Sequence, residues 1–442
     1  MKPVWPPIEF KPIASMQQEP SGAPYDFAAH GVPERPWLQP YHRMCVTKLC
    51  LIQGDEVKYD FLQTFEILKQ FDRLTRGLKK LIYLVVFPDH VYPCWFCLDE
   101  RFKRPQDASA WESLRWLMKE ARESCNTLLS LHINMLDAYR ESPWWETYEK
   151  YDIVHKQKDG TPSKGTVWGG HQSYPLSYYQ EWRLGFAQKR IDRLITLLPD
   201  LQHHTKSIHI DAFQCWENNY PSQPSPYLGH SQERECETMR RIFRYWRDRG
   251  IDVTAEGFLH KRNEDFAGLQ PWCWLPYHKA SDLHIWDCYP PHIYSTASLN
   301  LAKTLREHNW DVKQGLERLV FDLPRLVINY IRGQDLEEGR KPTYPFEREP
   351  YIKTPRAPFK PLPKPFVLPM PWREDRAFMI RREDDLDVTW PLPEGARGAS
   401  AVKICRITSE GEKEQCVTTV NNGYFTFCEA EPNRPYIVIP RF

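Results

Sequence analysis

The chain has 442 residues and a formal net charge of +1 at neutral pH. This length is enough for a large hydrophobic core and two or three domains. A balance this close to neutral excludes bulk electrostatic attraction to nucleic acid or to an anionic membrane as the basis of its function. Because no run of 18 apolar residues occurs, no membrane-spanning helix is expected.

The N-terminal part and the cysteines predict an intracellular protein. Residues 1–43 are rich in proline, show no sustained periodicity and predict an arm that lies on a surface. The first residues lack the apolar core of a signal peptide. The 12 cysteines are scattered, and Cys94 and Cys97 form a single CxxC pair. We therefore expect reduced, mostly buried thiols and a cytoplasmic location. Redox or metal chemistry at the CxxC loop is a weaker, separate hypothesis.

Apolar runs that alternate with helical periodicity begin near residue 45. Strands are predicted at 45–52, 81–87 and 128–134, with a helix after each of the first two. The segment 140–176 is predicted as a long irregular loop. Its aromatic content argues against disorder, so a functional role is expected. A helix is predicted over 182–198.

Two strands that each carry an acid enclose the next helix. Strands are predicted at 207–213 and 252–258, and a helix over 231–249 separates them. A strand–helix–strand unit requires parallel strands, so Asp211 and Glu256 should lie near the same edge of the sheet. The carboxyl edge of a parallel sheet is where chemistry is placed. Two acids on neighbouring strands suggest the carboxylate pair of a glycosidase.

The remaining elements complete a barrel pattern. A short strand is predicted at 283–287 and a helix at 296–308, whereas 319–331 fits a helix and a strand equally well. About six parallel strands alternate with helices, which favours an α/β fold of the (β/α)8 TIM-barrel type over an open sheet. This barrel spans residues 44–340. The proline-crowded residues 341–374 predict an extended linker.

The C-terminal residues 375–442 have a different pattern. Short alternating runs are separated by turn residues, as in Asn421-Asn422-Gly423. This pattern predicts a small antiparallel β-sandwich domain.

The order of several short motifs resembles that of a known family. The chain is similar to the endo-α-N-acetylgalactosaminidase glycoside hydrolases (family 101) and to the related intracellular α-N-acetylgalactosaminidases (family 129). Trp390-Pro391 and Asn422-Gly423 resemble the β-sandwich that follows the barrel in the first family. The barrel motifs that carry the resemblance are His132-Ile133-Asn134, Asp137-Ala138-Tyr139, Ile208-His209-Ile210-Asp211, Ala255-Glu256-Gly257 and Ile285-Trp286-Asp287.

The resemblance implies a retaining α-glycosidase that acts on GalNAc α-linked to Ser or Thr of mucin-type glycoproteins. It implies that Asp211 is the nucleophile and Glu256 the acid/base. It also implies sugar contacts from Asp137, where the family commonly has Glu, and from Trp168 and Gln172. The family's Gly-His-Asp-Ser motif is absent, and Phe87-Pro88-Asp89-His90 stands in its place, which leaves the sugar and the endo or exo mode open.

The chemistry fits two acids on adjacent strands. A retaining enzyme holds its carboxyl groups about 5–5.5 Å apart, and neighbouring strands lie about 4.8 Å apart. An ionised Asp211 and aromatic walls would raise the pKa of Glu256, so that it keeps its proton. Alternatively, both acids cap loops or helices.

Further residues are candidate sugar contacts. Flat aromatic faces suit sugar rings, although 17 Trp residues also fit ordinary packing. The polar candidates have alternative structural roles as buried, hydrogen-bonded strand residues or as partners of a backbone amide or an Arg. The candidates in addition to those implied by the resemblance are His132, Asn134, Asp287, Trp216 and Trp272.

Other chemistries have little support. The chain contains no HExxH, Walker A or strand-linked GxGxxG motif, and His203-His204 fits a helix end better than a metal site. Neither an organic cofactor nor a metal is expected. The expected partner is a carbohydrate or glycopeptide, without nucleic acid or membrane, and a homo-oligomer is left open.

Two other functions remain as alternatives. One is an α-glycosidase for another sugar, such as an α-galactoside. The other is a non-catalytic sugar-binding barrel. A binding protein would keep the aromatic residues without needing both Asp211 and Glu256, so the presence of both acids favours the enzyme.

Overall fold

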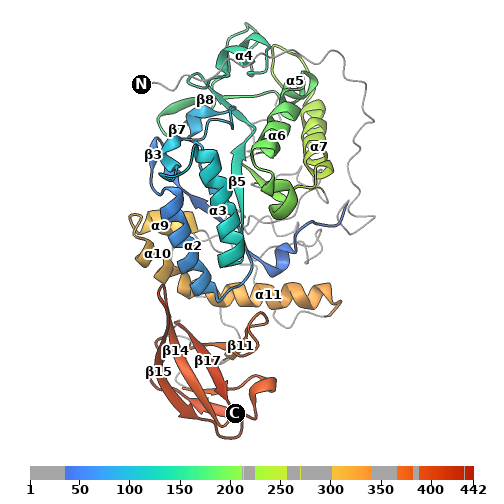
Figure 1. Ribbon diagram of the computed structural model, residues 1–442. Coiled ribbons are helices and arrows are strands. Elements are labelled where there is room, and N and C mark those ends of the chain that lie inside the picture. The colour runs from blue at the N-terminus through green and yellow to red at the C-terminus, as the bar shows by residue number, and fades with distance from the viewer. Residues whose placement is uncertain are drawn as a thin grey trace.

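The structure is a computed structural model that describes residues 35–211, 213, 224–255, 269, 301–340, 366–381, 388–432 and 434–442. Within these residues, a parallel sheet with helices lies above an antiparallel sheet in Figure 1. The predicted combination of an α/β part with a parallel sheet and a C-terminal antiparallel part is confirmed. The five parallel strands of the described ranges form an open sheet, and no closed barrel is seen among them.

The parallel sheet contains its five strands in sequence order. A doubly wound sheet would reverse its order at a switch point, and these strands do not. The predicted strands near 45, 81, 128, 207 and 252 are therefore confirmed as neighbours in one sheet. They are β1 (Cys45–Cys50), β4 (Lys80–Val85), β5 (Thr127–Asn134), β9 (Ser207–Asp211) and β10 (Asp252–Ala255).

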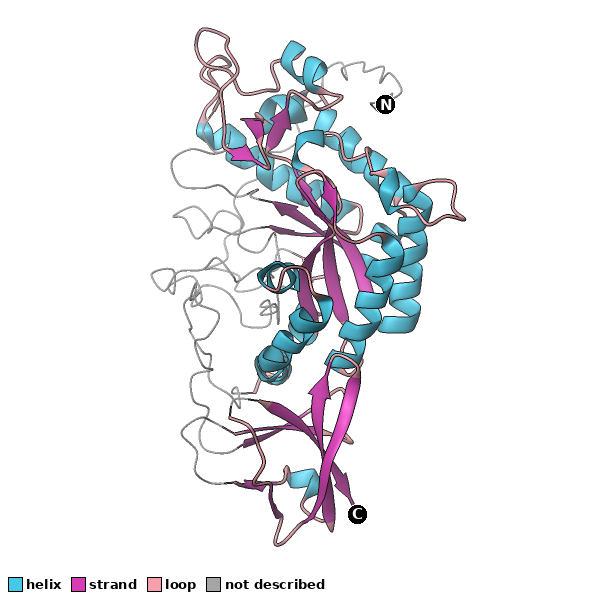
Figure 2. Cartoon of the chain, turned by 90° about the vertical axis from the view of Figure 1, so that its left-hand side faces the viewer, coloured by secondary structure: helices cyan, strands magenta, loops and turns pink. Residues whose placement is uncertain are grey.

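Amphipathic helices connect these strands and lie along one side of the sheet (Figure 2). In α3, the residues predicted to share one face, such as Leu114, Leu117 and Met118, are buried. Helix α2 begins with a capping box in which the Asp60 side chain accepts a hydrogen bond from the Gln63 backbone N–H. The helices are α2 (Phe61–Thr75), α3 (Ala110–Cys125), α6 (Phe186–Leu197) and α7 (Gln232–Asp248).

The strand–helix–strand unit around α7 forms as predicted. The Ser231 side chain caps α7 by accepting a hydrogen bond from the Arg234 N–H. Gly250 follows the helix with φ +75°, a left-handed conformation that glycine adopts without strain. Strands β9 and β10 then pair in parallel, with Ile210 opposite Ala255.

The described residues before β1 pack against the parallel sheet. Residues 1–34 lie outside the described part of the chain, but Tyr41, in the short turn η1 (Tyr41–Arg43), is only 1% exposed. Its hydroxyl contacts Ser207 Oγ at 2.9 Å and donates to Asp252 Oδ2 at 3.1 Å. The backbone N–H of Leu38 also donates to Asp252, at 2.7 Å. Residues near position 40 therefore seal the amino end of the sheet.

The segment 140–176 is not the irregular loop that the sequence predicts. Strand β8 pairs antiparallel with both β6 and β7, and a short helix lies between β6 and β7 in the chain. The prediction was wrong because strands of two to five residues are too short to show periodicity. The elements from this region are β6 (Asp137–Tyr139), α4 (Trp145–Lys150), β7 (Val167–Trp168) and β8 (His171–Pro175).

The other predicted helices form with changed boundaries. The predicted helix over 182–198 overlaps two helices, because Gly185 has φ +81° between them. The ambiguous segment 319–331 is helical, and the predicted strand at 283–287 lies outside the described residues. The remaining helices are α5 (Tyr178–Arg183), α9 (Leu301–Glu307), α10 (Val312–Leu319) and α11 (Leu323–Glu337). The short helical turns are η2 (Asp89–Val91), η3 (Glu100–Phe102), η4 (Leu201–Thr205), η8 (Val320–Asp322) and η9 (Glu394–Ala396).

The C-terminal residues form a five-stranded and a two-stranded antiparallel sheet that share a core around the buried Trp390. The first strand, β11, lies within the range predicted as linker. Arg76, just after α2, pairs with Glu412 at 3.0 Å and joins this part to the helices. The strands, in spatial order, are β11 (Phe366–Pro369), β12 (Ala377–Ile380), β17 (Pro435–Arg441), β14 (Ala401–Thr408) and β15 (Gly411–Thr419), with β13 (Thr389–Pro391) paired to β16 (Tyr424–Thr426).

Two short strands, β2 (Ile52–Gln53) and β3 (Glu56–Val57), form a hairpin directly after β1.

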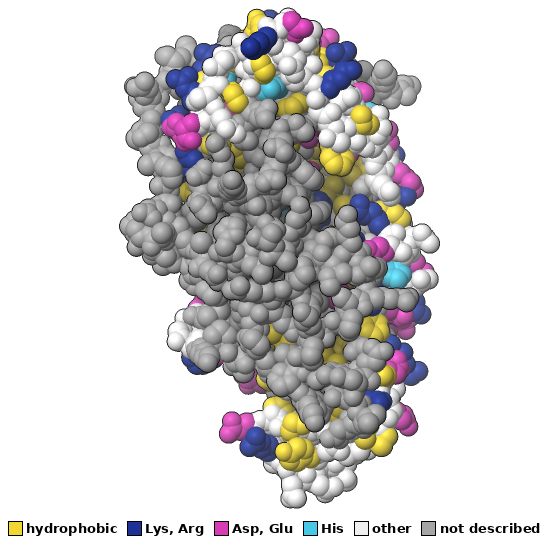
Figure 3. Space-filling view, turned by 180° about the vertical axis from the view of Figure 1, so that it is seen from behind, with side chains coloured by type: hydrophobic (Ala, Val, Ile, Leu, Met, Phe, Trp, Pro, Cys, Tyr) yellow, Lys and Arg dark blue, Asp and Glu magenta, His cyan; other side chains and the backbone are white. Residues whose placement is uncertain are grey.

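On the face seen in Figure 3, described side chains of Lys and Arg are interspersed with those of Asp and Glu. A search of the described residues finds no helix with the length and hydrophobicity needed to cross a membrane.

Candidate functional site

The two faces of the parallel sheet differ in chemistry. Side chains alternate along a strand, so residues two apart share a face. Leu131, Ile133 and Ile210 lie in the main hydrophobic core together with residues of the covering helices. A parallel sheet covered on both faces is usually apolar on both. Here the other face carries a hydrophobic cluster with Val46, Leu81 and Leu128 toward the amino ends of the strands. Toward the carboxyl ends it carries polar side chains, and this part is called the polar face.

Four adjacent strands contribute to this polar face. The rings of His132 on β5 and His209 on β9 stack with centroids 5.2 Å apart, and Tyr83 on β4 lies 5.1 Å from His209. His209 Nδ1 and Thr254 Oγ1 on β10 are 2.8 Å apart. All four side chains are buried. The polar face therefore extends without a break from β4 to β10.

Asp211 stands at the carboxyl end of this face. It pairs with Asn134 across β5 and β9, and its side chain is 32% exposed, whereas His132 is buried. Its Oδ2 lies 3.5 Å from His132 Nε2. Burial lowers the pKa of His132, with Lys48 acting in the same direction and Asp211 against it. A neutral His132 beside a partly exposed carboxylate can orient Asp211 without neutralising it.

Asn134 and Asp137 form a rigid turn beside Asp211. The side-chain oxygen of Asn134 accepts hydrogen bonds from the backbone N–H groups of Leu136 at 2.7 Å and Asp137 at 2.9 Å. Its Nδ2 donates to Asp137 Oδ2 at 3.0 Å. The Trp95 indole N–H donates to the Asn134 backbone oxygen at 2.9 Å. Asn134 therefore shapes the turn and holds the Asp137 carboxyl group in place.

Three carboxyl groups influence one another at this edge. Burial raises the pKa of Asp137 to about 7, and the charges of Asp211 and Asp89 add to the effect while Asn134 opposes it. Burial, followed by the charge of Asp211, raises the pKa of Asp89 to about 6. Such shifted carboxyl groups are a frequent property of active sites.

The pH dependence of stability should reveal Asp137. Its pKa is higher in the folded chain than the ordinary value of 3.8, so between about pH 4 and 7 the folded state binds more protons. Raising the pH through this window therefore destabilises the fold, by up to about 1.4 kcal/mol for each pH unit. Asp137→Asn should remove the share of this dependence that Asp137 contributes, and near pH 7 it should be more stable than wild type by about 4 kcal/mol, which is about 1.4 kcal/mol for each of about three pH units. Urea unfolding from pH 4 to 8 measures the difference.

A matched control for this measurement is Glu66→Gln on the exposed side of α2, where the side chain is 63% exposed. Its stability curve should run parallel to that of wild type. If the Asp137→Asn curve also runs parallel to wild type across pH 4–7, the buried, protonated carboxyl is disproved.

A buried ion pair supports the loop behind Asn134. Arg190 on α6 and Glu181 on α5 are both fully buried, with an N–O distance of 2.7 Å. The Tyr148 hydroxyl donates to the same carboxylate at 2.6 Å. Arg190 also donates to the Pro93 carbonyl at 3.2 Å and lies over the Trp95 ring, 4.3 Å from its centroid. Two helices thereby hold the loop that contacts Asn134.

Trp168 and Gln172 lie on a different element from Asp211. Both belong to the β7–β8 hairpin, and Trp168 is 45% exposed. The Gln172 side chain donates to the backbone oxygens of Gly165 at 2.8 Å and Ser173 at 3.0 Å. Gln172 therefore has a structural role in the hairpin, while Trp168 presents an aromatic surface.

The other predicted site residues lie outside the described part of the chain. They are Glu256, Trp216, Trp272 and Asp287. The sequence analysis also missed Lys48 and Asp89 as site residues. Lys48 interacts electrostatically with His132, His209 and Asp89, so it belongs to the same face. It lies opposite Tyr83 through the register of β1 and β4, which local sequence patterns do not determine, so no signal in the sequence identified it.

Comparisons with known proteins give only distant similarities. No family model matches the chain, and no curated protein matches it. It is similar to the α-N-acetylgalactosaminidase NagBb from Bifidobacterium bifidum in its GalNAc complex, with 12% identity and a TM-score of 0.43, over 55% of this chain and 40% of that one. The α-galactosidase TtGalA from Thermus thermophilus with stachyose gives 14% identity and 0.38, over 64% and 54%. Similarities of this size establish neither a shared fold nor a shared activity.

Proposed function

We propose that the protein is a retaining α-glycosidase that hydrolyses α-linked N-acetylgalactosamine, with Asp211 as the nucleophile. The observation that carries the proposal is the position of Asp211. This carboxylate ends a parallel strand, lies on the polar face of the sheet and is partly exposed beside the buried His132. A nucleophile must reach an anomeric carbon from such an edge.

The strand register supports Glu256 as the acid/base. Ala255, the residue before it, pairs with Ile210, the residue before Asp211. Thr254 contacts His209 on the polar face, and side chains alternate along a strand. One further step along both strands would bring the acids of positions 211 and 256 opposite each other on that face. The two groups would then be near the separation that a retaining mechanism needs.

The reaction would proceed in two displacements. In the first, Asp211 attacks the anomeric carbon while Glu256 protonates the leaving oxygen, which gives a covalent glycosyl-enzyme. In the second, Glu256 deprotonates water, which attacks the same carbon and releases the sugar and Asp211. His132 would hold Asp211 in position. Asp137 is proposed to contact a sugar hydroxyl, and Trp168 to offer a face to the sugar or the aglycone.

The proposal extends to the architecture. Five consecutive parallel strands in sequence order are what the first part of a (β/α)8 barrel requires. We propose that the barrel closes through later residues of the predicted range 44–340, and that the two C-terminal sheets are a β-sandwich domain.

A panel of synthetic glycosides tests the substrate. The purified protein is incubated with an aryl α-GalNAc, an aryl α-galactoside and the aryl glycoside of Galβ1-3GalNAcα. Release from α-GalNAc alone supports the exo mode, and release of the intact disaccharide supports the endo mode. Cleavage of only the α-galactoside contradicts the GalNAc specificity and supports an α-galactosidase instead. Binding without hydrolysis of any of the three, in folded protein, contradicts the enzyme and favours a sugar-binding barrel.

A further inference from the structure

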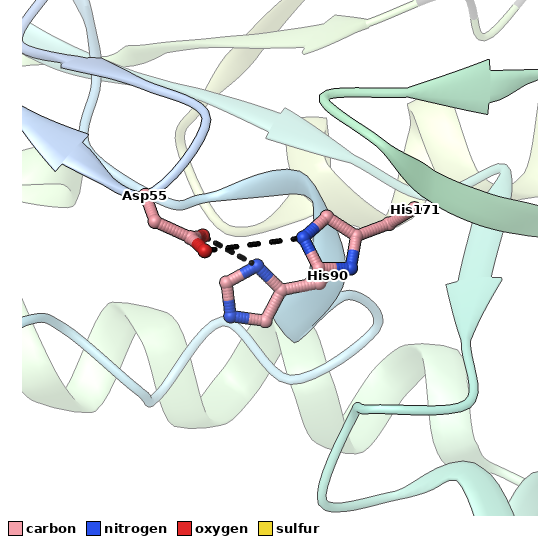
Figure 4. A group of neighbouring side chains, drawn as sticks. All are labelled: Asp55, His90 and His171. Carbon is pink, nitrogen blue, oxygen red and sulfur yellow. Dashed lines mark ion pairs between the residues drawn. The ribbon is translucent and has the colours of Figure 1, made fainter.

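Three side chains from loops far apart in the sequence meet beside the candidate site (Figure 4). Asp55 comes from the β2–β3 turn, His90 from η2 after β4, and His171 from the start of β8. One ligand-type atom of each lies within 4.8 Å of the others. His90 Nδ1 is 3.1 Å from Asp55 Oδ1, and His171 Nε2 is 4.0 Å from Asp55 Oδ2.

The surrounding backbone brings these loops together. A side-chain carbon added at Gly169 would lie 3.6 Å from the Gly54 backbone, so the β7–β8 and β2–β3 turns are in close contact. Both glycines have positive φ, near +55°. The Arg101 side chain donates a hydrogen bond to the Asp55 carbonyl at 2.8 Å. The backbone contacts of the β2–β3 and β7–β8 turns therefore bring the three side chains together.

The second nitrogen of His171 has its own partner. His171 Nδ1 lies 3.2 Å from Glu141 Oε1. An ionised carboxylate can only accept a hydrogen bond, so Glu141 favours the tautomer in which Nδ1 carries the proton and Nε2, which faces Asp55, is the nitrogen available to a metal. A carboxylate that holds one imidazole nitrogen while the other faces outward is the usual outer support of a metal-ligating histidine.

We propose that Asp55, His90 and His171 bind one divalent transition-metal ion of the zinc class. Two imidazole nitrogens and one carboxylate oxygen are ligands that Zn²⁺ favours, at about 2.0–2.2 Å each. Asp55 is 67% exposed and can rotate to close the longer distance to His171. The ion would tie the three loops together at the carboxyl edge of the sheet. This inference does not depend on the proposed glycosidase activity.

The test is direct metal binding to chelator-treated protein. Co²⁺ titration, followed by visible absorption, should show one bound ion per chain that Zn²⁺ displaces. His171→Ala and Asp55→Asn should each weaken Co²⁺ binding by at least about tenfold, and Glu141→Gln by about 10–100-fold. Because Asp55 is exposed, its variant should fold normally, which circular dichroism checks. The control, His204→Ala, removes an exposed histidine outside the cluster and should bind as wild type.

Two results would overturn the proposal. No saturable Co²⁺ binding would mean that Asp55 and His90 form only a hydrogen-bonded pair. Binding that survives His171→Ala and Asp55→Asn would place the ion elsewhere. In particular, binding that is lost in Cys94→Ser would assign it to the buried Cys94–Cys97 pair, whose sulfurs are 3.0 Å apart.

Discussion

Asp211→Asn is expected to lower the hydrolysis rate of the preferred aryl glycoside by about 10³-fold or more, because an amide cannot attack the anomeric carbon. The side chain keeps its size, and its position at the strand end is partly exposed, so the fold should be retained. The measurement is steady-state kinetics on wild type and variant, with unfolding curves for both. Activity that survives the substitution would refute Asp211 as the nucleophile.

Two further variants make this result specific. Asp159→Asn changes an exposed loop acid far from β9 in sequence and should leave the rate unchanged. Glu256→Gln should lose most activity on a substrate with a poor leaving group and much less on an activated aryl glycoside, because only the poor leaving group needs a proton. Equal losses on both substrates would count against an acid/base role for Glu256.

Arg190→Met is expected to destabilise the protein by about 3–5 kcal/mol, because Glu181 would remain buried without its cationic partner. Both side chains are fully buried, and the pair also holds Pro93 and Trp95 in place. Urea unfolding at pH 7 measures the loss. Because Trp95 contacts the backbone of Asn134, the variant should also lose activity beyond its loss of folded protein.

A double variant separates a lost ion pair from a lost packing contact. Arg190→Met with Glu181→Met removes both charges and should recover much of the stability, since a buried pair is worth little against apolar residues of similar volume. Lys69→Met breaks the exposed pair with Glu66 and should cost less than about 1 kcal/mol. If the double variant is as unstable as the single one, the unpaired charge is not the cause.

The elements that the sequence predicts correctly are those with long, regular patterns. The apolar runs of β4 and β5 and the helical spacing of α3 and α7 are visible without a structure, because burial of one face dictates them. Asp211 can also be located from the sequence, because it directly follows the apolar run of β9. Strands β6, β7 and β8 cannot be located in this way, because their pairing depends on partners elsewhere in the chain rather than on local periodicity.

The site is predictable only in part. Asp211, His132 and Asn134 follow from strand ends that run to the same edge. Lys48 and Asp89 join them through the lateral order of β1, β4 and β5, which the residues alone do not determine. The sequence does not predict the cluster of Asp55, His90 and His171, since the cluster depends on contact between two turns that contain glycine.

The contact between Tyr41 and Asp252 has a consequence for how the chain folds as it is synthesised. The strands β1, β4, β5, β9 and β10 can add to the sheet one after another as they leave the ribosome, since each pairs with the one before it. The residues that seal the amino end cannot do so, because Tyr41 and Asp252 are 211 residues apart. The segment around Tyr41, among the first described residues to be made, must wait for β10 before it reaches its place.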